Sequence, residues 1–166
     1  MINKKRRFLL SGFAGGIVLL WYNKGFFGGV RVLDTIALLQ KDIFPYTDGV
    51  PDVDDISAKK YVALILNHPR INDRDKEFLK NGVKWLNEEA LELFDDVYIK
   101  LSFEKRQSVL KSIAKTSWGE SFIADNLTYI FEAMFGDPVY GINKDEVGWR
   151  WLNYKTGLPR PKVAYV

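Results

Sequence analysis

Residues 74–95 read RDKEFLKNGVKWLNEEALELFD, and their apolar members recur every three or four positions. This spacing places them on one face of an α-helix, which turns once every 3.6 residues. Asn72 or Asp73 stands just before the run, and both are side-chain types that cap helix N-termini. A broad apolar face needs other elements to cover it, so this segment predicts a helical core. The residues of the predicted face are Phe78, Leu79, Val83, Trp85, Leu86, Ala90, Leu91, Leu93 and Phe94.

Two helices are predicted before this segment. Val30–Phe44 carries its apolar residues at the helical period, and Pro45 ends it. Asp54 or Asp55 is expected to cap the next helix, which runs to a stop at Pro69. Both stops follow from proline, because it has no N–H to donate and restricts the residue before it.

Two more helices are predicted after the segment. Ser102 is expected to cap the first, and Ser117 the second, because Glu120 stands at the offset of a capping box. Gly136 then ends the last helix. Strand-like alternation and repeats are absent from the sequence. The sequence therefore predicts an all-α fold, a small single-domain helical bundle over residues 25–166 with an irregular, aromatic-rich C-terminal tail.

Positive charge is concentrated at the N-terminus. The 166-residue chain has 24 basic and 21 acidic residues, but five of the basic ones and no acidic one fall within the first 24 positions. The remainder therefore carries 19 basic against 21 acidic residues. A nucleic-acid-binding domain keeps a basic surface in its folded part, so no nucleic-acid partner is expected. The chain has no cysteine, which excludes disulfides, thiolate metal sites, covalent haem attachment and a lipoprotein anchor.

The first 24 residues have the layout of a targeting segment. Met1–Arg7 is polar and basic, and Phe8–Tyr22 reads FLLSGFAGGIVLLWY, an uncharged and mostly apolar run. A spanning helix needs about 20 apolar residues, so this run is short for a permanent span. A basic start followed by a short apolar run is typical of an export signal.

The segment resembles a twin-arginine export signal in particular. Arg6, Arg7, Phe8 and Leu9 carry the resemblance, and Lys5 with Arg6 is a second possible register for the basic pair. A signal of this kind implies the twin-arginine (Tat) translocase and a periplasmic location at the cytoplasmic membrane. We expect residues 1–24 to form either such a signal or an uncleaved N-terminal anchor. A buried N-terminal helix of a cytosolic domain is the remaining alternative.

The folded part shows no catalytic or metal-binding pattern. His68 is the single histidine and has no nearby ligand set, so a surface or capping role is expected. The acids of VPDVDD lack the Gly and Glu of an EF-hand calcium loop and are expected to form turns and caps. Adjacent acids such as Glu88 and Glu89 point about 100° apart on a helix, which suits a solvated face. We expect no catalytic residue and no metal ligand here; an enzyme in its own right stays an alternative.

The C-terminal segment from Phe135 to Pro161 reads FGDPVYGINKDEVGWRWLNYKTGLPRP. It is rich in Gly and Pro, has little helical period, and sets aromatic residues among turn residues. Rigid rings on turns suit an adhesive surface. They suit equally a tail that folds back to complete a thin core, and the sequence leaves both interpretations open. The aromatic residues concerned are Tyr140, Trp149, Trp151 and Tyr154.

The same segment resembles a known family. FGDPVYGIN at residues 135–143, followed by Gly148–Trp149 and Tyr154, is similar to the Pro-x-Tyr-Gly-Gly-Asn run and downstream Trp of the small subunit (subunit 3, or gamma) of membrane-bound gluconate 2-dehydrogenase. Ile142 stands where the family has its second Gly, and Asn153–Gly157 replaces a Gly-Tyr-Pro-Gly turn. The likeness extends in order and length over nearly the whole chain, and the family commonly begins with a twin-arginine signal.

This resemblance implies an accessory role in a complex. In such a complex a flavoprotein of the glucose–methanol–choline (GMC) type oxidises a sugar acid or sugar with FAD, and a c-type cytochrome subunit takes the electrons through haem c. The small subunit carries no known cofactor and helps the flavoprotein to fold and to cross the membrane. A membrane-anchored envelope binding module without a dehydrogenase partner is the alternative. The residues expected to contact the partner are Pro138, Tyr140, Gly141, Asn143, Trp149, Trp151 and Tyr154.

Overall fold

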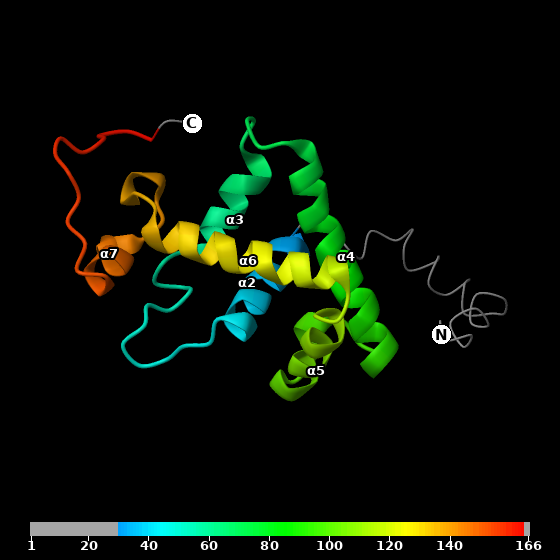
Figure 1. Cartoon of the computed structure of the whole chain (residues 1–166). Helices are drawn as coiled ribbons and strands as arrows, with labels where there is room; N and C mark the ends of the chain where they lie inside the picture. The colour runs from blue at the N-terminus through cyan, green and yellow to red at the C-terminus, as the bar shows by residue number, and fades with distance from the viewer. Residues whose placement is uncertain (1–29, 165–166) are drawn as a thin grey trace.

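The computed structural model describes residues 30–164, and all regular secondary structure in this range is helical (Figure 1). The predicted all-α, single-domain fold is confirmed for this part of the chain. The elements are the α-helices α2 (Val30–Ile43), α3 (Ala58–Asn67), α4 (Asp73–Phe94), α5 (Phe103–Ile113), α6 (Ser117–Phe135) and α7 (Val147–Trp151), and the 3₁₀ turns η2 (Tyr98–Lys100), η3 (Pro138–Tyr140) and η4 (Lys144–Glu146).

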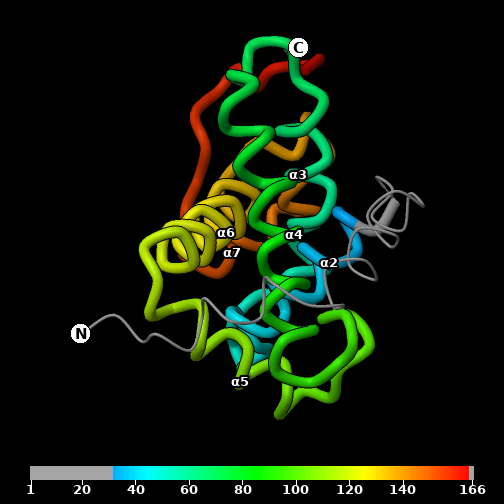
Figure 2. Tube along the Cα trace, turned by 90° about the vertical axis from the view of Figure 1, so that its right-hand side faces the viewer, coloured from blue at the N-terminus to red at the C-terminus, as the bar shows by residue number. Residues whose placement is uncertain are grey.

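Helix α6 is the element against which most of the others pack. In Figure 1 it runs across the molecule, with α4 crossing it at one end and α7 lying at the other. Figure 2, turned by 90°, shows α6 nearly end-on beside α4. Contacts join α6 to α2, α3, α4, α5 and α7, and α4 also packs along α5. The short C-terminal elements therefore sit at one end of a bundle whose other end is closed by α4 and α5.

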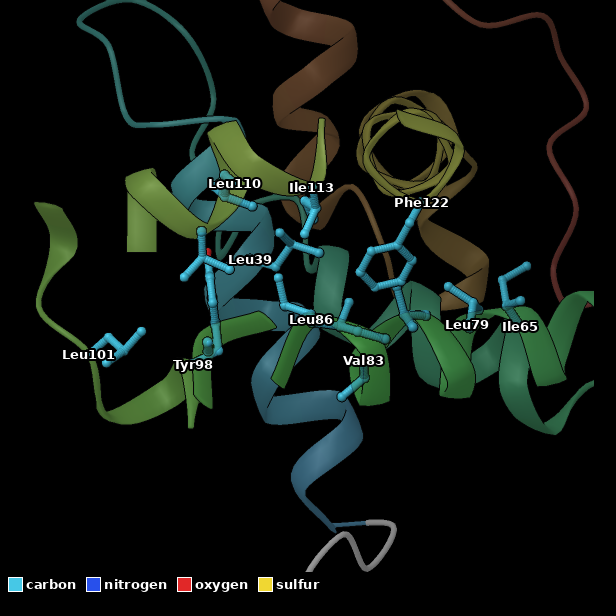
Figure 3. Packing of buried hydrophobic residues seen from close by; sticks show 14 residues of the cluster. Leu39, Ile65, Leu79, Val83, Leu86, Tyr98, Leu101, Leu110, Ile113 and Phe122 are labelled. Carbon is cyan, nitrogen blue, oxygen red and sulfur yellow. The ribbon is translucent and has the colours of Figure 1, made fainter. Parts of the chain in front are cut away.

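The main core lies where α2, α4, α5 and α6 meet. Each of these helices contributes at least one fully buried side chain, and these side chains point toward one another (Figure 3). Gly82 on α4 lies directly against the ring of Phe122 on α6, so a side chain at position 82 would overlap that ring. The two helices cross closely because position 82 is glycine. Representative core residues are Leu39, Leu86, Ile113 and Phe122.

Several predicted helix ends are confirmed. The long helix begins after Asn72, whose side-chain oxygen accepts a hydrogen bond from the backbone N–H of Arg74 at 2.7 Å. Helix α2 ends at Ile43, one residue short of the predicted end and before Pro45. Gly136 is the C-terminal cap of α6, as predicted.

Other predicted caps are wrong in whole or in part. Helix α6 is capped by Thr116, not Ser117, because the Thr116 hydroxyl oxygen accepts a hydrogen bond from the Gly119 N–H at 3.1 Å. Ser102 does stand at the N-cap position of α5, as predicted, but its side chain makes no capping hydrogen bond. The residue before α3 is Ser57 in a left-handed conformation, not an aspartate. The N–H of Ser57 donates to the backbone carbonyl of Asp54 at 3.0 Å, so the chain turns here and α3 begins four residues beyond Asp54. The Asp54 side chain pairs instead with Lys41 at 2.6 Å.

A buried ion pair ties the end of α2 to α5. The guanidinium of Arg106 donates two hydrogen bonds to the carboxylate of Asp42, at 2.6 and 2.9 Å, and the Tyr98 hydroxyl donates a third at 2.6 Å. The Asp42 side chain is only 3% exposed. The hydrogen bond from Arg106 to Asp42 raises the pKa of Arg106, and burial raises the pKa of Tyr98, so both groups remain donors at neutral pH. The Asp42 carboxylate is thus buried, and both of its oxygens accept hydrogen bonds.

The predicted export-signal residues Arg6, Arg7, Phe8 and Leu9, and the whole predicted segment 1–24, lie outside the described residues. Between residues 30 and 164, none of the helices combines the length and the apolar composition that crossing a bilayer requires.

Replacing Arg106 by Met should destabilise the fold by about 3 kcal/mol, because it leaves the buried Asp42 carboxylate without its charge partner. Urea unfolding followed by circular dichroism measures the change. Lys41→Met is the matched control, because it breaks the neighbouring exposed pair with Asp54 and should cost less than about 1 kcal/mol. Equal losses for the two variants would contradict the role assigned to the buried pair.

Candidate functional site

The C-terminal segment is attached to the end of α6 through Asn143, which is fully buried. Its side-chain amide donates to the carbonyl of Gly136 at 3.1 Å, and its side-chain oxygen accepts from the N–H of Gly148 at 2.8 Å. Its backbone N–H donates to the carbonyl of Ile56 at 3.0 Å. One residue therefore joins the end of α6, the start of α7 and the loop before α3. Asn143 has a φ of 45°, a left-handed conformation that asparagine tolerates better than most residues.

Trp149 makes the second attachment. Its indole N–H donates to the carbonyl of Phe135 at 2.7 Å, and its side chain lies inside the fold, with the residue 6% exposed. Gly148 lies against the backbone of Met134 so closely that a side chain there would overlap it, and α7 can approach α6 for this reason. The last carbonyls of an α-helix have no partner within the helix. Here Asn143 and Trp149 supply partners for two of them.

Arg160 closes the segment from outside. Its guanidinium lies over the Trp149 ring, 4.8 Å from the ring centre, and pairs with Asp137 at 3.1 Å and with Glu146. A cation over an indole face and two carboxylates around it form a local network. The chain that follows α7 is thereby held against the turn after α6.

The predicted partner-contact residues separate by exposure. Two are buried within the chain, Pro138, Tyr140 and Gly141 are half-buried, and Trp151 and Tyr154 are 42% and 57% exposed. The interpretation as core thus holds for Trp149, which belongs to the packed interior, whereas Trp151 lies at the surface. Contact of these residues with a partner stays a prediction. The buried two, Asn143 and Trp149, are placed to shape a neighbouring surface rather than to form it.

Ile142, which stands where the family motif has its second glycine, does not have a left-handed backbone conformation. Ile142 is 2% exposed and packs against Gly136, and its φ is not positive. Gly141 does have a positive φ, 73°, and the side chain of Lys60 lies directly over it. Gly141, the glycine that this chain retains, therefore has the left-handed conformation that favours glycine. Position 142 does not have this conformation, so it accepts the β-branched side chain of isoleucine.

Two exposed phenylalanines were not singled out by sequence reasoning. Phe131 and Phe135 lie on the C-terminal half of α6, and they are 41% and 37% exposed. Their rings stack on each other, 6.1 Å apart with 13° between their planes, and the Phe44 ring meets Phe131 edge-on at 5.8 Å. The sequence signal that could have found them is their spacing of four residues, which places both on one face of α6, a different face from that of the buried Phe122 and Ile130.

Phe135 also lines a cleft of about 490 Å³ between α3 and the end of α6. One hydrogen bond among its lining residues joins α3 to α6: the Tyr61 hydroxyl donates to the Glu132 carboxylate at 2.9 Å. Burial raises the pKa of Tyr61, and this hydrogen bond raises it further, so the hydroxyl stays protonated. The lining residues are Tyr61, Leu64, Ile65, His68, Ile71, Glu132, Phe135, Gly136, Asp137, Tyr140 and Ile142.

The cleft has the composition of a docking surface for apolar groups. His68 lines it, but its ring nitrogen Nδ1 accepts a hydrogen bond from the N–H of Arg70 at 3.1 Å, which is the local capping role expected from the sequence. In the part of the chain that the structure describes, no cluster of three His, Cys, Asp or Glu residues is placed to hold a metal ion. The arrangement can accept aromatic or aliphatic side chains of a partner.

These features define a small helical protein whose C-terminal motif fastens its own last long helix and leaves an apolar face beside it. Among known protein families, the model of gluconate 2-dehydrogenase subunit 3 matches residues 32–157, so the chain belongs to this family. The matched range runs from α2 past Trp149, and it includes both attachment residues. Neither a curated protein nor a solved structure matches the chain.

Trp149→Phe should destabilise the chain by about 1–2 kcal/mol, because it keeps a ring at this position but leaves the Phe135 carbonyl without its donor. Urea unfolding of the purified chain gives the value. Trp151→Phe is the matched control: this indole is exposed, so the change should stay within about 0.5 kcal/mol. If both variants unfold at the same urea concentration as the wild type, the indole hydrogen bond does not fasten the segment.

Proposed function

We propose that this protein is the non-catalytic small subunit of a periplasmic FAD-dependent dehydrogenase complex. In the complex, a GMC-type flavoprotein oxidises a sugar acid or sugar, and a cytochrome c subunit takes the electrons through haem c. The observation that carries the proposal is the family match over residues 32–157, because this family is defined by a subunit of a dehydrogenase complex.

The arrangement of the C-terminal end supports a binding role. Its hydrogen-bonding side chains are used to fasten α7 and the tail to α6, and the surface beside them is apolar. Contiguous apolar surface on a folded chain commonly marks a protein interface. A subunit that contributes binding surface while its partner contributes the cofactor is consistent with both features.

The N-terminal segment gives the proposal its second part. We propose that residues 1–24, with Arg6 and Arg7, form a twin-arginine signal that takes the folded, FAD-loaded partner across the cytoplasmic membrane together with this subunit. The composition of this segment, basic up to Arg7 and then uncharged over residues 8–23, supports this assignment. The complex would then act on the periplasmic face of that membrane.

The direct test is co-production of the tagged chain with the GMC-type flavoprotein of the same organism. We expect the two to co-purify in a fixed ratio with bound flavin, and we expect dye reduction by a sugar acid or sugar only when the flavoprotein is present. A monomer that binds no flavoprotein would favour an envelope binding module. Turnover by the purified chain alone would show that it is itself an enzyme.

The export role predicts the behaviour of a signal variant. Changing Arg6 and Arg7 together to Lys should keep the flavoprotein in the cytoplasm, because the paired arginines are the part of the signal expected to be recognised. Flavin-dependent activity in periplasmic and cytoplasmic fractions measures the effect. A normal periplasmic level of flavoprotein in this variant would rule out the carrier role, while leaving the binding role to be judged by co-purification.

A further inference from the structure

Two exposed aromatic rings, Phe131 and Phe135, lie on the C-terminal half of α6 beside the half-buried ring of Phe44, and we call these three residues the aromatic strip. Phe131 and Phe135 are one helical turn apart and stack with only 13° between their ring planes. Phe44, at the end of α2, supports Phe131 edge-on. The rings are thus held in one arrangement, although Phe131 and Phe135 remain more than one third exposed.

The strip continues into the cleft between α3 and α6, because Phe135 belongs to both. The continuous surface therefore offers two ridges of aromatic side chain followed by a hollow of about 490 Å³. Aromatic side chains on a rigid helix next to a pocket are the arrangement typical of the energetic centre of an interface. A ring fixed before binding also loses little conformational entropy when a partner covers it.

Trp149 and Asn143 fix the helix end on which this surface lies. Trp149 donates to the carbonyl of Phe135 itself, and Asn143 donates to the carbonyl of Gly136, which lines the cleft. These two residues therefore act as positioning residues. Their burial and their place in the family motif are both accounted for if they hold the end of α6 in the conformation that the partner contacts.

The border of the strip carries negative charge. The loop that leaves Phe44 reads PYTDGVPDVDDIS over residues 45–57, with four aspartates and no basic residue. It is packed onto α6, because Val53 and Ile56 share a buried cluster with Ile130 and Met134. Lys41 pairs with one of the four aspartates, Asp54. At the far end, by contrast, Lys60 lies beside Gly141.

We propose that the aromatic strip and the adjoining cleft form the surface that binds the flavoprotein subunit, and that the flavoprotein presents an apolar centre with Lys or Arg residues opposite the loop 45–57. This inference rests on the proposed function. A second copy of the chain fits less well, because it would bring a border of the same negative sign, four aspartates against Lys41 and Lys60, rather than a basic one.

The test is binding of the purified flavoprotein to full-length variants of this chain, measured by titration. Phe131→Ser with Phe135→Ser should weaken binding at least tenfold, because the two central rings are lost. Leu91→Ser with Leu93→Ser is the matched control, since these residues are similarly exposed, 39% and 44%, on the last turns of α4 at the opposite end of the bundle. The control pair should bind within about twofold of the wild type, and circular dichroism of both pairs should show the wild-type helix content.

A second pair of variants tests the charge at the border. Asp48→Asn with Asp55→Asn should weaken binding and flatten its dependence on salt, because both effects follow from losing attraction to basic residues. Glu77→Gln with Glu92→Gln, exposed acids on α4, should change neither. An unchanged salt dependence in the loop variant would rule out the basic rim assigned to the flavoprotein.

The outcomes distinguish a failure of the proposed function from a failure of the interface assigned to the aromatic strip. If the wild-type chain binds no flavoprotein, the proposed function fails. If the wild type binds and the Phe131 and Phe135 pair binds equally well, while Trp151→Ser with Tyr154→Ser loses binding, the interface lies on α7 and this inference is wrong. It is also wrong if the phenylalanine pair converts a dimer of this chain into monomers without changing flavoprotein binding.

Discussion

The arrangement of the C-terminal end of α6, with the cleft and α7 beside it, depends on capping of this helix by side chains that come later in the chain. A helix ends with carbonyl groups that have no partner within it, and here Asn143 and Trp149 donate to the carbonyls of Gly136 and Phe135. These two hydrogen bonds fasten α7, the 3₁₀ turns and the tail to one helix end. They also fix where the exposed Phe135 ring and the cleft lie. The family motif is thus explained by what it holds in place.

The helices were largely predictable from the sequence because their signals are local. The apolar period placed α2 and α4, Pro45 marked the end of α2, and Asn72 was a correct cap because its partner is only two residues away. The caps of α3 and α6 were not predictable in the same way. The chain turns at residues 54–57, so Asp54 lies too far before α3 to cap it, and Thr116 and Ser117 are chemically equivalent candidates one residue apart. Backbone geometry decided both cases.

The site was predictable as a region but not in its details. The motif was located from its residues, yet the sequence could not separate Trp149, which is buried, from Trp151, which is exposed. That difference depends on α7, a short helix with too few residues to show a period. The exposed Phe131 and Phe135 were missed because an apolar residue on a helix is assigned to the core by default. Which apolar residues face the core depends on how α2, α3 and α7 pack against α6.

In the complex that we propose, a motif buried inside this chain presents an apolar surface to a flavoprotein partner. Hydroxyl-radical footprinting of the chain, alone and in complex with the flavoprotein, tests that claim at the level of single side chains. We expect labelling of Phe131 and Phe135 to fall strongly in the complex, while labelling of Leu91 and Leu93 does not change. Protection confined to Trp151 and Tyr154, with Phe131 and Phe135 labelled as in the free chain, would contradict it.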